Sequence, residues 1–527
     1  MPESSTDPAT VGTYLDDAAH VPGGYASAVM FPRTEREVAD IVSSSDRVLV
    51  IGAQSSLTGG ATPRGDVLLS TARLRAMERL PDGRLRVGAG VTIAEIDACL
   101  RASGALYPPG PTWPGATIGG TIATNAAGPA TFKYGSTRAW IDALTLVLPS
   151  GDVLDVVRGA TRASADGWFD IETPAGIVRV PVPSYRMPDV LKLSAGYFAA
   201  PGMDAIDLII GSEGTLGVVT EATLRVVPER PAVALVFVTF RDRAQCLACV
   251  DGLRAASMRT WRTGDPVGLD VSAIEYMDQR CLALLREDGV DARLGIGLDP
   301  SAAMALLIAV DLAPDASADD AYAQLSGEAP GPLAALAARL AVHAALDDAL
   351  VAMPGDLAAA ERLAALREAV PVAVNQRVGQ AARTADARIS KTAADVIVPV
   401  DRLGELLARI EDAYAREGLD GAVWGHISDG NLHPNVMPRS FDEFTTGRNL
   451  VMRIGEAAID LGGSPLAEHG VGRNPTKQAL LRALYGDEAL AQMRAVKHAI
   501  DPRGVLARGV LFPSDDEREG GRGGPAA

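Results

Sequence analysis

Residues 52–60, with the sequence GAQSSLTGG, follow a short apolar run at 48–51 and form the first of three glycine-rich stretches that decide the fold. Small residues let backbone N–H groups approach a ligand closely, and successive N–H groups in such a turn make a concave site for an anion such as a pyrophosphate. The stretch matches neither GxGxxG nor GxxxxGK[ST], which disfavours an ordinary NAD or ATP fold. Alone, such a turn is as often structural as functional.

Two further stretches of this kind follow along the chain. Residues 108–128 (PPGPTWPGATIGGTIATNAAG) are mostly small and apolar and include no charged side chain, so a flat aromatic ring can lie against them while backbone amides bond its heteroatoms. Residues 211–220 have the sequence GSEGTLGVVT. Three ordered stretches favour a nucleotide cofactor more strongly than any one of them does.

Composition excludes several classes of protein. A length of 527 residues suggests two to four domains, and the net charge of -17 makes nucleic-acid binding a poor hypothesis. Four cysteines are too few for a disulfide scaffold or an iron–sulfur set, and the CxxC at 246–249 lies in a helical pattern, where coincidence explains it better than a metal site. With no apolar run of about 20 residues and no basic-then-apolar leader, we expect a cytoplasmic protein, either free or peripheral at a membrane.

Three of the six histidines lie in two glycine-flanked motifs, WGHISDGNLHPN at 424–435 and LAEHGVG at 466–472. Asp429-Gly430 is a favoured two-residue hairpin turn, which would pair His426 with His433 across the strands and bring Asn435 to the same face. Cross-strand Cβ atoms about 4.5–5.5 Å apart allow both imidazoles to reach one metal ion.

The second motif supplies an oxygen ligand and a base. Glu468 can complete a site of two histidines and one carboxylate, which leaves open positions as catalytic metal sites do. Its neighbour His469 suits a general base. We expect a divalent metal, first Zn²⁺, with Mn²⁺ or Fe²⁺ as alternatives. The competing interpretation is a hairpin with two buried, hydrogen-bonded histidines.

Together these motifs resemble the vanillyl-alcohol-oxidase-type FAD-binding fold, and within it the D-lactate dehydrogenase/glycolate oxidase flavoprotein family, which includes D-2-hydroxyglutarate dehydrogenase. The resemblance runs from about residue 20 to 513. It implies an α+β fold with a PCMH-type FAD-binding domain, an α+β (ferredoxin-like) cap domain and a C-terminal helical segment. We divide the chain into a flexible N-terminus (1–18), the FAD-binding domain (19–230), the substrate or cap domain (231–480), a segment returning to the FAD domain (481–513) and a disordered tail (514–527).

The resemblance also implies how FAD is held. The pyrophosphate would lie on 52–60, the isoalloxazine near 108–128 and the adenosine side on 211–219. The implied cofactor-binding residues are Gly52, Ala53, Gln54, Ser55, Ser56, Leu57, Thr58, Gly59, Pro109, Gly119, Thr121, Thr124, Asn125, Gly128, Tyr134, Gly135, Glu213, Gly214, Gly217, Val218 and Val219. Gln54 takes the place of a family glycine, so it must turn outward or bond the flavin. No His or Cys stands at an obvious attachment position, so noncovalent FAD is expected.

For the reaction site, the family's metal ligands match His426, His433 and Glu468, and its base matches His469. Arg367 resembles the family's carboxylate-binding Arg, and Lys391 resembles its Lys ahead of a D-x-x-x-P strand. We count Arg367, Lys391, Asn435 and His469 as catalytic candidates. The Arg367–Lys391 interval is longer than in the family, so Arg383 and Arg388 compete for the same role. Ser428 replaces a usual glycine, and Ala507-Arg508 replaces a usual Asn-Pro.

The resulting hypothesis is FAD-dependent oxidation of a small D-2-hydroxy acid, of the D-lactate, glycolate or D-2-hydroxyglutarate class, to its 2-oxo acid. Reduced FAD would pass electrons to a quinone, a cytochrome, a carrier flavoprotein or oxygen, and a homodimer is one arrangement considered. Two alternatives stay open. One is a flavoenzyme of the same fold that acts on another alcohol or catalyses a non-redox flavin reaction, and the other is a flavin-free zinc hydrolase.

Overall fold

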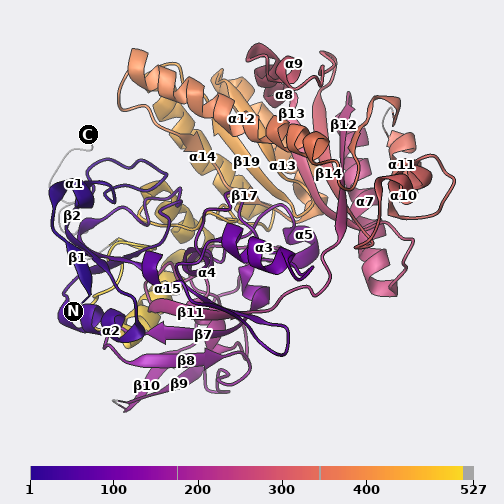
Figure 1. The fold of residues 1–527 in the computed structure, drawn as a ribbon. Coiled ribbons are helices and arrows are strands. Elements are labelled where there is room, and N and C mark those ends of the chain that lie inside the picture. Colours follow the sequence, from indigo (N-terminus) through magenta and orange to yellow (C-terminus); the bar gives the residue numbers. More distant parts are fainter. Residues whose placement is uncertain (1, 175, 344–345, 514–527) are drawn as a thin grey trace.

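Two bodies of mixed helix and strand make up the computed structural model, which describes residues 2–174, 176–343 and 346–513 (Figure 1). In the first body a four-stranded sheet has the order β1-β2-β4-β3, in which β2, β4 and β3 run parallel. A five-stranded antiparallel sheet has the order β5-β6-β11-β7-β8, and β9 and β10 form a separate pair. The strands are β1 (Glu3–Ser5), β2 (Tyr25–Phe31), β3 (Val48–Ile51), β4 (Arg64–Ser70), β5 (Met77–Arg79), β6 (Leu85–Gly88), β7 (Ile141–Val147), β8 (Val153–Val157), β9 (Trp168–Thr173), β10 (Gly176–Pro181) and β11 (Val218–Leu224).

Short helices and long loops connect these strands, and the glycine-rich stretches lie mostly in these connections. The helices are α1 (Pro8–Gly12), α2 (Glu35–Ser44), α3 (Ile93–Arg101), α4 (Ile118–Thr124), α5 (Thr131–Tyr134) and α6 (Ala205–Ile209). The side chain of Thr92 accepts the N–H of Glu95, and Glu95 bonds back, which makes a capping box that begins α3. Helix α4 begins inside the apolar stretch 108–128 and ends at Asn125, whose φ of 48° closes the helix in the left-handed region.

The N-terminal residues are part of the first sheet. Strand β1 pairs antiparallel with β2, and Asp7 caps α1. Asp17 is only 3% exposed and accepts the N–H of Ala61 at 3.2 Å. The flexible N-terminus expected for 1–18 is therefore not what the described residues 2–18 form. The polar composition of this segment did not indicate these contacts, because β2 and the loop at Ala61 lie further along the sequence.

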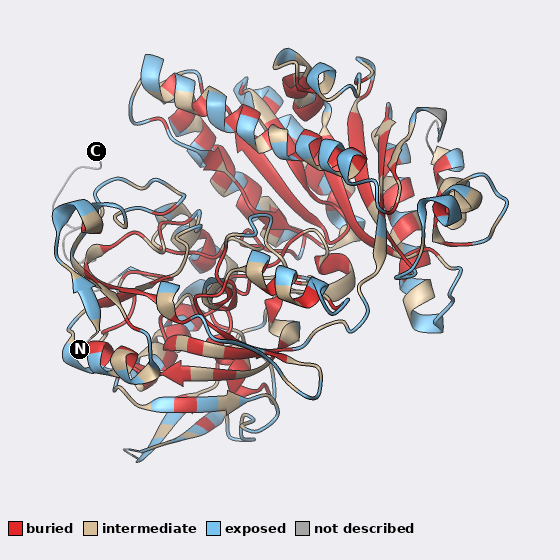
Figure 2. Ribbon diagram, in the orientation of Figure 1, coloured by how far each residue is buried: buried red, intermediate tan, exposed pale blue. Residues whose placement is uncertain are grey.

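The second body is built on a single antiparallel sheet with the order β15-β12-β14-β13-β18-β19-β16, and β17 pairs with β19 beside this path. Its strands are β12 (Ala232–Phe240), β13 (Val271–Asp278), β14 (Met304–Leu312), β15 (Leu350–Ala352), β16 (Thr392–Ala393), β17 (Val396–Ile397), β18 (Gly421–His426) and β19 (Asn431–Val436). Figure 2 shows the central strands buried. Such burial on both faces explains why β14 has the nearly continuous apolar sequence MALLIAVDL.

Helices cover both faces of this sheet. One face packs on α7 (Arg243–Thr263), α11 (Pro332–His343), α13 (Leu403–Glu417) and α14 (Phe441–Asp460). The opposite face packs on α8 (Gln279–Glu287) and α12 (Leu357–Thr384). Helices α9 (Val290–Arg293) and α10 (Ala318–Leu325) lie at the periphery (Figure 1). This arrangement confirms the expected α+β fold class.

The Ala/Leu-rich stretch 332–370 does not form a single helix. Helix α11 ends at His343, the short strand β15 intervenes, and α12 continues through Pro371 to Thr384. Pro371 lacks the N–H that would bond the carbonyl of Arg367, yet α12 continues across this position. The longer Arg367–Lys391 interval is thus additional helix rather than an extended loop.

The C-terminal part returns to the first body. Helix α15 (Pro475–Ile500) bends at Gly486, and beyond it Leu506 forms a parallel bridge with Val48 of β3. The N–H of Val48 donates to Val505 O at 2.8 Å, and the N–H of Ala507 donates to Val48 O at 2.9 Å. Over the described part of the chain, no helix combines the length and apolar character needed to cross a membrane. The expected tail, 514–527, lies outside the described residues.

Candidate active site

The His-rich hairpin joins β18 to β19, but its register differs from the prediction. Trp424, rather than His426, is the partner of His433. The loop is four residues long, because Asp429 N–H donates to His426 O and Gly430 N–H donates to Ile427 O. A shift of two residues preserves the side of the sheet, so His426 and His433 still share one face, with ring centroids 5.5 Å apart.

Contacts outside the hairpin set this longer loop. Ser428, which stands where the family has glycine, is fully buried, and its hydroxyl accepts the N–H of Ile274 in β13 at 3.1 Å. Gly430 has φ of 91°, and a Cβ there would lie 2.2 Å from Val398 O. Ser428 therefore attaches the loop to the sheet, and Gly430 allows the backbone at Val398 to approach closely.

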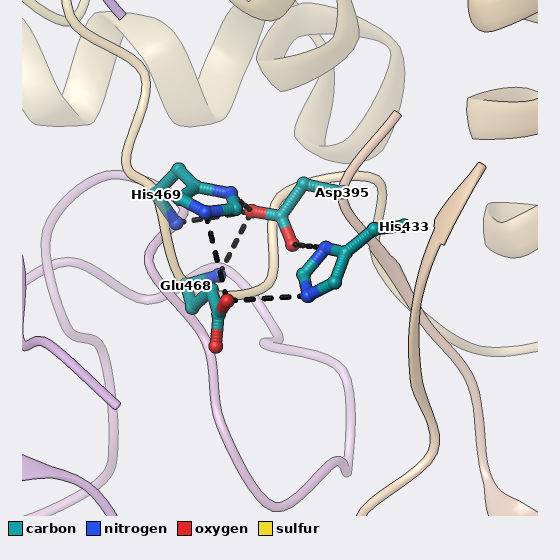
Figure 3. Close-up of side chains that lie close together, drawn as sticks. All are labelled: Asp395, His433, Glu468 and His469. Carbon is teal, nitrogen blue, oxygen red and sulfur yellow. Dashed lines mark hydrogen bonds and ion pairs between the residues drawn. The ribbon is translucent and has the colours of Figure 1, made fainter. Parts of the chain in front are cut away.

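One oxygen of Glu468 lies at the centre of the site. Its Oε1 is 3.3 Å from Nε2 of His433 and 3.6 Å from Nε2 of both His426 and His469. Figure 3 shows Glu468 and Asp395 facing each other between His433 and His469. The structure thus brings together His426, His433, Glu468 and His469, the four residues that the two sequence motifs supplied.

Asp395, at the start of the β17 segment, was not among the predicted site residues, although it organises the motif at 466–472. Its Oδ2 accepts the backbone N–H groups of Glu468 and His469, each at 3.0 Å. The same oxygen is 2.9 Å from Nδ1 of His469, and Oδ1 is 3.6 Å from Nδ1 of His433. Burial opposes ionisation of Asp395, but His469 and Lys477 hold the pKa of its carboxyl well below the ordinary value. An ionised Asp395 directs Nδ1–H of His469 toward itself and leaves Nε2 facing Glu468.

His426 belongs to a buried chain of charged groups on the other side. Its Nδ1 bonds Glu275 of β13, and Glu275 accepts Nε–H of Arg367 at 2.7 Å. Burial disfavours the charges, yet His426 and Arg367 lower the pKa of Glu275 to about 2. Arg367, predicted to grip the substrate carboxylate, is 9% exposed and commits its Nε to Glu275. Only its terminal nitrogens remain for another anion.

Lys192, in the loop between β10 and α6, was missed by the sequence analysis. The side chain has no solvent exposure, and its Nζ lies 2.8 Å from Glu468 Oε2 and 3.1 Å from Asp429 Oδ2. Burial opposes its charge, but the two carboxylates outweigh that effect and raise the pKa of Lys192 above its ordinary value. A lysine among apolar neighbours in a loop has no local pattern that distinguishes it from a surface lysine.

The two hairpin histidines have opposite ionisation. Burial lowers the pKa of His433 to about 4, with nearby carboxylates only partly offsetting it, so the ring is neutral at neutral pH. Burial also opposes charge on His426, but Glu275 raises its pKa to about 9. His433 therefore offers a lone pair directly, whereas His426 would release a proton on binding a metal.

The donor set fits a divalent metal. Metal bonds of about 2.0–2.2 Å in a tetrahedral site place neighbouring ligand atoms roughly 3.4 Å apart, and the Glu468–His433 and Glu468–His426 separations are 3.3 and 3.6 Å. Within the described residues, Asp395, His433, Glu468 and His469 also offer ligand atoms within 4.8 Å of one another. Imidazole nitrogens with carboxylate oxygens suit Zn²⁺, Mn²⁺ or Fe²⁺.

The remaining candidates lie apart from this centre or beside it. Asn435 is buried on the same face, and its Oδ1 has no hydrogen-bond partner among the described residues. Lys391 is exposed and lines a cavity of about 170 Å³ with Arg448, Lys477 and Asp395, but Arg367 does not line it. Arg388 pairs with Asp386 at 2.6 Å. The structure therefore does not join Arg367 and Lys391 in one pocket.

Several predicted cofactor residues use their side chains to hold the protein itself. Gln54 Nε2 donates to Tyr14 O, Asp16 O and Ala61 O at 3.0–3.1 Å, so it turns outward, as one of the two expectations had it. Tyr134 donates to Asp311 of the second body at 2.8 Å. Glu213 accepts backbone N–H groups at 471 and 472. The polar groups of these three side chains thus bond within the protein, and their contact with FAD stays a prediction.

Other features of the first body fit a flat nucleotide cofactor. The hydroxyls of Tyr107 and Thr117 are buried and have no hydrogen-bond partner among the described residues. A Cβ at Gly52 would lie 2.3 Å from Thr117 Oγ1, so the first glycine-rich loop packs closely against the second. Unsatisfied buried donors beside glycine-rich backbone are the groups that a bound polar ligand satisfies.

Gln54 provides a prediction about the first loop. We expect Gln54→Ala to leave three carbonyls without their donor and to lower the free energy of unfolding by about 1–3 kcal/mol. The loop should also hold FAD less tightly, because the amide links it to residues 14–16. Thermal unfolding and the FAD dissociation constant measure both effects. Arg36→Ala, at an exposed position of α2 in the same body, is the control, and equal values for both variants would refute the anchoring function.

Comparison with protein families matches both bodies. A model described as "FAD binding domain" matches residues 26–156, and one described as "FAD linked oxidases, C-terminal domain" matches residues 230–511, more than half of the chain. The chain belongs to the FAD-linked oxidases. It is accordingly an FAD-dependent oxidoreductase, and the predicted family resemblance is confirmed.

Curated relatives of this FAD-linked oxidase cover nearly its whole length. Glycolate oxidase subunit GlcD of Bacillus subtilis is 27% identical over 95% of this chain and 92% of its own. D-2-hydroxyglutarate dehydrogenase of Xanthomonas citri is 28% identical over 93% and 90%. Mitochondrial D-lactate dehydrogenase [cytochrome] of Arabidopsis thaliana is 27% identical over 92% and 73%. The names agree on hydroxy acids and differ in the acid.

Solved structures support the fold independently. Alkyldihydroxyacetonephosphate synthase superposes on this FAD-linked oxidase with a TM-score of 0.62 at 14% identity, covering 96% of this chain and 82% of that one. At this identity the likeness shows the fold alone. It confirms the predicted vanillyl-alcohol-oxidase-type FAD-binding architecture.

Proposed function

We propose that this FAD-linked oxidase converts a small D-2-hydroxy acid to the 2-oxo acid, with His426, His433 and Glu468 as ligands of a divalent metal. The single observation that carries the proposal is the position of Glu468 Oε1, which faces Nε2 of three histidines at 3.3–3.6 Å. The names of the relatives, which act on glycolate, D-lactate or D-2-hydroxyglutarate, support the substrate class.

The chemistry that the absent groups supply when bound is hydride acceptance by FAD and polarisation of the substrate hydroxyl by the metal. The chain's own residues handle the proton. His469 accepts the hydroxyl proton at Nε2, because Asp395 occupies Nδ1 at 2.9 Å. Arg367 offers its terminal nitrogens to the carboxylate, and Asn435 Oδ1 offers an acceptor to the substrate hydroxyl. Lys391 would join them only if its side chain turned from its own cavity.

A flavin-reduction assay tests the proposal. The purified protein should be yellow, with noncovalent FAD absorbing near 450 nm, and should contain a divalent metal. Under anaerobic conditions a panel of D- and L-2-hydroxy acids should bleach the flavin with D-selectivity, and a chelator should abolish bleaching without releasing FAD. Bleaching by L-acids alone, or by alcohols without a carboxylate, would refute the substrate class. Full activity after metal removal would refute the metal centre.

A further inference from the structure

Glu213 joins two loops that come from distant parts of the sequence. It lies in the GSEG loop ahead of β11, which the sequence analysis assigned to the adenosine side of FAD. In the structure its Oε1 accepts Val471 N–H and its Oε2 accepts Gly472 N–H, each at 2.8 Å. Both carboxylate oxygens therefore accept hydrogen bonds from the loop that follows His469.

The backbone of both loops is shaped around this contact. Glu213 has φ of 53°, an unfavourable conformation for a residue with a side chain, and Gly470 and Gly472 have φ of 76° and 58°. A Cβ on Gly470 would lie 3.0 Å from the Glu213 carboxyl carbon, and one on Gly472 would lie 2.2 Å from Thr58 Oγ1. A strained residue persists when its surroundings fix it, and such residues gather at functional sites.

The two loops in this contact are connected to α4 of the first body and to His469, the proposed base. Glu213 N–H donates to Ala123 O at 2.7 Å, and Gly211 N–H donates to Ile122 O at 2.9 Å, which attaches the GSEG loop to α4. Helix α4 belongs to the apolar stretch expected to lie along the flavin ring. At the other end, Gly470 directly follows His469, whose N–H is held by Asp395. The loop of the base is thus held from both bodies.

We propose that Glu213 is a positioning residue for His469, whose backbone it clamps to the loop and helix of the FAD-binding body. The clamp sets the distance from the base to the cofactor side, while Asp395 sets the orientation of the ring. This inference rests on the proposed function, in which His469 takes the substrate proton. Burial raises the pKa of Glu213 to about 7 although two amides oppose the shift, which agrees with an enclosed contact between the two loops.

Glu213→Gln tests the clamp at nearly constant volume. The amide retains one acceptor oxygen and turns its NH₂ toward a backbone N–H, so one bond of the clamp becomes a repulsive contact. A displacement of about 1 Å in a reacting group costs up to roughly 100-fold in rate. We expect the anaerobic rate of flavin reduction by substrate to fall about 10- to 100-fold, with KM and the FAD dissociation constant changed less than about threefold. An unchanged rate, or FAD release above tenfold, would overturn the proposal.

A second measurement does not need the substrate. Hydrogen exchange should show the amides of Val471 and Gly472 protected in the wild-type holoenzyme and several-fold faster in Glu213→Gln. Glu221→Gln, on β11 and 3.5 Å from Arg86, is the matched control and should change neither exchange nor rate. If Glu213→Gln does not fold, Glu213→Asp keeps the charge on a shorter side chain and should show the same direction of change. Unaltered exchange in the folded variant refutes the clamp, whereas altered exchange in an enzyme that no 2-hydroxy acid reduces refutes only the proposed function.

Discussion

Replacing His433 by alanine is expected to reduce turnover at least about 1,000-fold and to leave FAD bound. His433 is the hairpin histidine whose ring is neutral at neutral pH, because burial lowers its pKa to about 4. Its Nε2 is the imidazole nitrogen nearest to Glu468 Oε1, at 3.3 Å. Without it, two of the three proposed ligands remain, and a site that loses a ligand loses both metal affinity and the activation of the substrate hydroxyl.

The measurement is kcat with the best 2-hydroxy acid, together with metal content and the flavin spectrum. His498→Ala, an exposed histidine near the end of α15, is the matched control and should retain wild-type values. His433 lies in the second body, away from the glycine-rich loops of the first, so FAD should stay. Turnover that survives the substitution with metal still bound would show that His433 is not a ligand, and loss of FAD would show that it supports the cofactor instead.

Local sequence patterns predicted much of the site because side chains alternate between the two faces of a strand. A register error of two residues therefore leaves each side chain on the predicted face. His426, His433 and Asn435 share a face whichever two-residue shift the hairpin takes. The exact register depended on Ser428 reaching Ile274 in β13 and on Gly430 passing Val398. A rule for two-residue turns considers only the hairpin itself. It includes neither contact, because Ile274 and Val398 lie in other segments of the second body.

The charged groups around the histidines were harder to predict for the same reason. Glu275 lies within the apolar strand sequence VSAIEYMD, and such a residue must have a partner, but the strand does not indicate which one. Glu213 had a motif, and the motif suggested a nucleotide contact rather than a clamp to residues 471 and 472. What the sequence could not supply was the packing of distant segments on one another, which brings Lys192 to Asp429 and Glu213 to the loop at 471–472.

Lys192→Met should be the most destabilising of these substitutions, because it leaves two buried carboxylates without their cation. Lys192 Nζ lies 2.8 Å from Glu468 and 3.1 Å from Asp429, and its side chain is fully buried. Removing one partner of a buried ion pair costs about 3–5 kcal/mol, so the metal-free protein should lose at least about 5 °C in its midpoint of thermal unfolding.

The double variant with Asp429→Asn should recover part of that loss, because one uncompensated charge is gone, while Lys192→Arg preserves the charge and tests the geometry. Additive effects of Lys192→Met and Asp429→Asn would contradict the coupling. Because this cation comes from the first body and Asp429 from the hairpin of the second, a positive result would also mean that the metal centre and the contact between the bodies share one set of charges.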